Sequence, residues 1–273
     1  MARTRAAAII TTIMATITTM DDVSERPHKI SGELSSQDAS MAVSKEGKSS
    51  DAAAKLLIWL SPAFPVGSFA FSHGLEWAVQ AGQVRNIATV IAWLDALLEH
   101  GGMRNDAIFA AHAWHAAMLR DARALIEINE LALAMAGSKE RYLETTAQGN
   151  AFVTIIRDAW RAPDFDWGIA SVRGDVAYPV AVGLTGAAHK ISQHEMLRCF
   201  VLAQVQNLVS AVIRLSVIGH TDGQHAIASL LPAVGRLVLV AETATLDDIG
   251  GAAFQSDIAA LRHETQYSRL FRS

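Results

Sequence analysis

From residue 51 onward, apolar residues recur at intervals of three and four, which is the spacing of one face of an α-helix. The stretch from residue 86 to residue 100 shows the pattern most clearly. Its apolar positions are Val90, Trp93, Leu94, Leu97 and Leu98. No stretch shows the alternation of apolar and polar residues that is typical of a half-buried strand. The sequence therefore predicts an all-α fold, a single-domain bundle of about eight to ten helices over residues 55–273.

Helix-breaking and helix-capping residues set the expected boundaries. The Ser61-Pro62 pair ends the first helix, because proline forces the residue before it out of the helical region. Ser192 and Glu195 form a capping box that opens a long helix to Ile218. The segment 162–175 contains proline and glycine and is expected to be a long connection. The last long helix, 222–243, is expected to be interrupted near Pro232.

The first 54 residues differ in composition from the rest. Residues 21–54 are rich in serine, aspartate, glutamate and lysine and hold few large apolar residues, so they cannot offset the entropy of ordering. The stretch Ala6–Met20 follows two arginines, as in an export signal, but it carries five threonines and no clear cleavage site follows it. We expect residues 1–54 to be a disordered extension and not an export signal.

The composition limits the classes of partner. Only 18% of the residues are charged, against about 25% in typical soluble proteins, so more of the surface is apolar and available for an interface. The net charge of −4 offers no basic excess for nucleic acid. The most apolar stretch, 199–219, contains two glutamines, an asparagine and an arginine. It therefore indicates a buried helix of a soluble protein and not a membrane span.

Motifs that could carry chemistry are incomplete. Gly47-Lys48-Ser49 resembles the end of a phosphate-binding loop, but the required earlier glycine is replaced by Ala42. His263-Glu264 resembles the start of a zinc-protease motif, but Tyr267 stands where the second histidine is needed. Cys199 lies in an apolar run and is expected to be a core residue. We therefore expect no catalytic residue, no metal site and no cofactor, and hence a binding protein.

One alternative stays open from the residues alone. His112 and His115 are three residues apart, so on a helix they share a face and could bind one metal ion. No third ligand is well placed nearby in the sequence. A helical metal-binding enzyme is thus the competing hypothesis.

Two segments are too apolar for their expected positions. The loop 61–75 places Phe64, Phe69 and Phe71 between prolines and glycines, and an aromatic loop either folds inward or docks on a partner. The last residues, 261–273, alternate apolar and basic side chains, whereas chain ends are usually polar and frayed. Both segments are candidate interaction surfaces.

These segments resemble the UreF family of urease accessory proteins. The first motif, Leu60–Phe69 followed by Ser72–Glu76, and the last, His263–Ser273, are the most specific. Two further matches lie between them, at Tyr178–Gly183 and at Arg214–His220 with Gly223-Gln224. The family often has a histidine where Ala177 or Tyr178 stands. The resemblance covers residues 55–273 in order and with compatible spacing.

The resemblance implies an all-α, dimer-forming protein of the cytoplasm that matures urease, an enzyme with a nickel pair at its centre. Such proteins bind the accessory protein UreD, also called UreH, and recruit the GTPase UreG. The complex then delivers nickel to the urease apoprotein. GTP hydrolysis belongs to the partner and not to this chain. A regulator of an unrelated GTPase is the remaining alternative within this class.

The resemblance and the residues together suggest a partner-binding surface. Its candidate residues are Gly67, Phe69, His73, Glu76, Arg269, Leu270, Phe271 and Ser273. We expect the tail to fold back so that Arg269 donates hydrogen bonds to carbonyls of the Gly67–Phe69 loop. Leu270 and Phe271 would then form an apolar patch with Phe69, and Arg269→Ala should abolish recruitment of the GTPase. Glu76 either caps its own structure or faces a partner.

Overall fold

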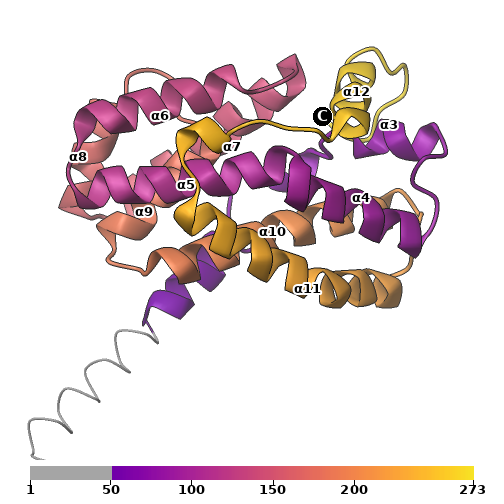
Figure 1. Cartoon of the computed structure of the whole chain (residues 1–273), viewed down its shortest axis with the longest axis horizontal. Helices are drawn as coiled ribbons and strands as arrows, with labels where there is room; N and C mark the ends of the chain where they lie inside the picture. Colours follow the sequence, from indigo (N-terminus) through magenta and orange to yellow (C-terminus); the bar gives the residue numbers. More distant parts are fainter. Residues whose placement is uncertain (1–50) are drawn as a thin grey trace, which may run out of the picture. The chain divides into compact units, whose positions relative to one another are not determined.

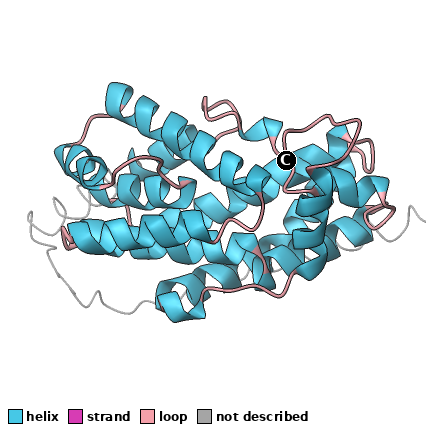
Figure 2. Ribbon diagram, turned by 90° about the horizontal axis from the view of Figure 1, so that it is seen from above, coloured by secondary structure: helices cyan, strands magenta, loops and turns pink. Residues whose placement is uncertain are grey.

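The computed structural model describes residues 51–273, and all regular structure within that range is helical (Figures 1 and 2). A helical segment over 51–59 comes first. It is followed by η1 (Ser68–Ala70), α3 (Leu75–Gln80), α4 (Ile87–His100), α5 (Gly102–Met118), α6 (Ala122–Ala134), α7 (Lys139–Ala159), α8 (Pro163–Ser171), α9 (Tyr178–Ala188), α10 (Gln193–Arg214), α11 (His220–Thr243), η2 (Leu246–Asp248) and α12 (Phe254–His263). The all-α prediction is confirmed for these residues.

The expected N-terminal extension lies mostly outside the described residues. The signal-like stretch Ala6–Met20 and the loop-like Gly47-Lys48-Ser49 both fall there. Residues 51–54, which the sequence analysis assigned to the extension, belong to the first helical segment.

Helix α9 is the element around which the bundle is built. Every residue from Pro179 to Ala187 is buried, and the helix packs against α5, α7, α8 and α10. Glycines at the crossings let the backbones approach. A Cβ on Gly183 would lie 2.3 Å from the carbonyl oxygen of Ala110 in α5, and one on Gly149 in α7 would lie 1.9 Å from that of Val176. Close packing through glycine therefore fixes α7 relative to the start of α9.

Helices α10 and α11 pack against each other, and both also contact α4 and α5. By length and composition, each of these two helices could cross a membrane. Each nevertheless buries one face within the bundle, including Phe200 and Val205 on α10 and Leu230 and Val238 on α11. The core position expected for the apolar stretch 199–219 is confirmed for its helical part, which ends at Arg214 and not at Ile218.

Two boundary predictions are wrong. The segment 162–175 is not simply a connection, because α8 begins at Pro163, where the fixed φ of proline suits a first helical turn, and buries Phe165. Helix α11 continues through Pro232. Pro232 and Ala228, whose carbonyl loses its helical partner, are both exposed, so water can satisfy that carbonyl.

Helix α12 was not expected from the sequence. Its N-cap residue, Ala253, provides no side-chain hydrogen bond, so no capping signal marks its start. Its large apolar residues, among them Phe254 and Ile258, are exposed, while its buried residues are Ala259, Ala260 and His263. The helical pattern was therefore obscured because the inward face is made of small or polar side chains.

The close approach at Gly149 can be tested by substitution. Gly149→Ala should destabilise the protein by about 1–3 kcal/mol, because the new methyl group overlaps the Val176 carbonyl. The matched control is Gly235→Ala on α11, where a Cβ meets nothing within 4 Å. There alanine should stabilise the helix by roughly 1 kcal/mol. Urea denaturation of both variants measures the difference, and equal stabilities would contradict this packing.

Candidate functional site

The C-terminal tail, residues 264–273, returns to the aromatic loop and runs beside it. The backbone N–H of Arg272 donates to the carbonyl of Ala70 at 2.7 Å. The backbone N–H of Ser72 donates to the main-chain oxygen of Ser273 at 2.7 Å, and the Ser72 hydroxyl donates to the same oxygen. The expected return of the tail to the loop is therefore observed, through main-chain contacts near its end.

The side-chain contacts expected for the tail are wrong. Arg269 does not donate to the loop carbonyls; its Nη1 donates to Oε1 of Glu140 on α7 at 2.6 Å. Phe271 is only 3% exposed and lies under the guanidinium of Arg214, whose carbon is 4.3 Å from the ring centre. It is thus a buried anchor and not part of a surface patch with Phe69. The sequence could not show that α7 places carboxylates under the tail.

Glu76, on the first turn of α3, receives the tail. Its Oε1 accepts the backbone N–H of Leu270 at 2.7 Å, and its Oε2 accepts that of Phe271 at 2.9 Å. The carboxylate is buried, and His263 Nε2 lies 3.1 Å from Oε2. Glu76 therefore faces its own chain, which answers the question that the sequence left open.

Gly74 brings α3 and α12 close enough for these contacts. It has φ of 74°, in the left-handed region that glycine adopts without strain, and it caps α3. A Cβ there would lie 2.4 Å from the backbone nitrogen of Ala260. The close approach aligns His263, at the end of α12, with Glu76; Figure 1 shows α3 and α12 side by side near the C-terminus.

His263 joins α12 to two other helices. Its Nδ1 lies 2.6 Å from Oε2 of Glu140, and its Nε2 faces Glu76. The ring has no exposed surface. Glu140 thus holds both His263 and Arg269, one on each carboxylate oxygen. Two glutamates from α3 and α7 enclose one histidine.

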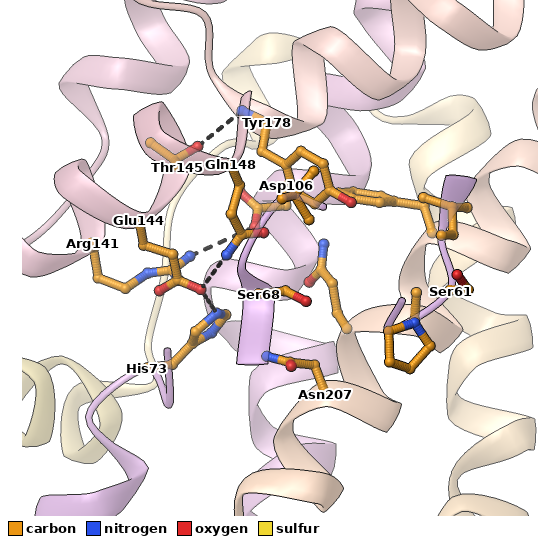
Figure 3. Close-up of a pocket in the computed structure, with 16 residues that line it drawn as sticks. Ser61, Ser68, His73, Asp106, Arg141, Glu144, Thr145, Gln148, Tyr178 and Asn207 are labelled. Atoms are coloured by element: carbon orange, nitrogen blue, oxygen red, sulfur yellow. Dashed lines mark hydrogen bonds and ion pairs between the residues drawn. The ribbon is translucent and has the colours of Figure 1, made fainter. Parts of the chain in front are cut away.

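A second buried carboxylate on α7, Glu144, holds the last residue of the tail. Figure 3 shows the contacts of Glu144 with its neighbours in the bundle. Its Oε2 accepts from Arg141 Nη1 at 2.7 Å and from the Ser273 hydroxyl at 3.1 Å. Its Oε1 pairs with His73 Nε2 at 2.7 Å and accepts from Gln148 Nε2 at 3.1 Å. Burial alone would raise the pKa of Glu144, but the charges of His73 and Arg141 and the hydrogen bonds of His73 and Ser273 lower it to about 2.

A cavity of about 60 Å³ lies next to this carboxylate, with room for several water molecules. Figure 3 shows His73, Arg141 and Glu144 on one side and Asn207 on a facing helix. Burial raises the pKa of Asp106 in its wall, although the nearby Arg141 opposes that shift. The wall is largely apolar, and its charged side chains, which are His73, Asp106, Arg141 and Glu144, already take part in the network that holds the tail.

The candidate residues from the sequence divide into three groups by exposure. Phe69, Arg269 and Leu270 are exposed. Glu76, Phe271 and Ser273 are buried. His73 and Gly67 are partly exposed and both have positive φ, 56° and 72°. The first group can touch a partner, and the buried group fixes the tail to the bundle.

Sequence reasoning missed Glu140, Arg141 and Glu144. It placed His263 in an incomplete zinc motif and in the terminal family motif, but assigned it no contact. A signal was present, because Glu140, Glu144 and Gln148 are spaced by four and so share one face of α7. Such a polar row is normally taken as a solvent-facing surface. Here Glu140 and Glu144 are buried against the tail, α12 and the loop before α3, and Gln148 donates to Glu144.

The histidine pair of the competing hypothesis has another role. His112 Nε2 lies 3.0 Å from the carbonyl of Ala244, and burial lowers the pKa of this histidine. Within residues 51–273, no group of three or more histidine, cysteine, aspartate or glutamate side chains is placed to hold a metal ion. The pair therefore gains no third ligand from the described fold.

The network predicts a specific loss of stability in acid. The pKa of Glu144 falls from its ordinary value of 4.5 to about 2 on folding, so its contribution is complete above about pH 4.5 and is lost as the pH falls toward about 2. The contribution of the ionised Glu144 to the free energy of unfolding is about 3 kcal/mol. Urea denaturation between about pH 5 and about pH 2.5 should show this slope. In Glu144→Gln the slope should flatten, and an unchanged slope would refute the assignment.

The role of Glu76 predicts a loosened tail. Glu76→Gln removes the charge that accepts two tail N–H groups, and such bonds contribute about 1.5–3 kcal/mol each. Trypsin should therefore cleave after Arg269 at least roughly ten times faster than in the wild type. The control is Glu264→Gln, which changes an acceptor of the Lys139 N–H at the rim. Equal cleavage rates in both variants would argue against Glu76 as the anchor.

Comparison with known proteins places this architecture in a family. The family model described as UreF matches residues 84–231. The urease accessory protein UreF of Xanthobacter autotrophicus is 50% identical over 230 residues, which cover 83% of this chain and 95% of that protein. The urease accessory protein UreF of Rhodopseudomonas palustris, strain HaA2, is 50% identical over 219 residues, 80% of this chain and 92% of the relative. That of Methylobacterium sp. strain 4-46 is 49% identical over 80% of this chain and 87% of the relative.

These matches extend over most of the helical bundle. They agree with the expectation of a non-catalytic accessory protein, because the relatives are described by that role. On this evidence the chain belongs to the UreF family of urease accessory proteins.

Proposed function

We propose that this protein matures urease by acting as the scaffold of a nickel-insertion complex in the cytoplasm. It binds UreD (UreH), recruits and modulates the GTPase UreG, and presents the assembly to the urease apoprotein. It works as a homodimer. Membership of the UreF family supports the general role, and the tail supports the specific one.

The observation that carries the proposal is the fixed but partly exposed tail. Its backbone is anchored through Glu76 and through the Ser72–Ser273 contact, so its position is defined before any partner arrives. Leu270 is nevertheless 62% exposed and Phe69 is 61% exposed. A partner that covers both side chains therefore binds without first ordering the tail, which lowers the entropic cost of association.

The charge of Arg269 orients the partner on this apolar contact. The side chain of Arg269 is 40% exposed, while one of its guanidinium nitrogens is held by Glu140. Aromatic residues and arginine are enriched at protein interfaces, which favours Phe69 and Arg269 as contact residues. We define the docking surface as Phe69, Arg269 and Leu270. The GTPase is its proposed occupant, because the resemblance assigns GTPase recruitment to this family.

Leucine substitutions on and off the docking surface test the proposal. Leu270→Asp places a charge in the proposed contact while its N–H can still bond to Glu76, so affinity for UreG in the presence of UreD should fall by about 30-fold or more. The matched control is Leu239→Asp on α11, where the leucine is equally exposed at 61%. Co-expression followed by size-exclusion chromatography and affinity measurement reads out both variants. Arg269→Ala should also abolish recruitment.

A complex that forms equally well with Leu270→Asp and with the control would refute the docking surface. Removal of residues 261–273 gives an independent check. It deletes Arg269 and Leu270 of the docking surface together with the buried residues Phe271 and Ser273 that fix the tail to the bundle. Circular dichroism should show that the helical bundle remains in each point variant.

A further inference from the structure

We draw no further inference here: the strongest candidate, the exposed apolar face of α12 formed by Phe254, Ile258 and Leu261, carries nothing because nothing in the structure shows what covers it.

Discussion

The buried carboxylates of Glu76, Glu140 and Glu144 determine how the C-terminal end of this protein is built. An ionised carboxylate is stable in the interior only if donors surround it, and most of the donors here come from the tail, from α12 and from the loop before α3. The bundle and the tail therefore depend on each other. Removing the tail would take away four of these donors and uncover the carboxylates, and removing any one carboxylate would free part of the tail.

The core supports this arrangement through helix α7. Glycine-mediated packing of Gly149 against the start of α9 fixes the position of α7 on one side. On another side the same helix presents Glu140 and Glu144 to the tail. A close backbone contact in the core and a charged network at the surface are thus joined by one rigid helix. Arg269 of the docking surface, which is held by Glu140, owes its position to both.

The sequence predicts the fold class well because helical spacing and caps are local signals. The cap at Ser192 is found as expected, and α4 ends before Gly101. Helix α12 could not be predicted, since its inward face is small or polar. The return of the tail to the loop was predicted, but its side-chain contacts were not. Nothing local indicates that Arg269 would pair with Glu140, 129 residues away. Such pairings depend on how helices cross, which periodicity does not report.

The distances along the chain between these partners have a consequence for the order of folding. The bonds from the tail to Glu76 join residues 194 and 195 positions apart, and Ser72 meets Ser273 across 201 positions. Closing such long loops is entropically unfavourable until the intervening helices are packed. The tail is therefore expected to seat last, on a bundle that is already complete. A partner that recognises the seated tail would then reject unfinished chains, so the docking surface would also report that folding has ended.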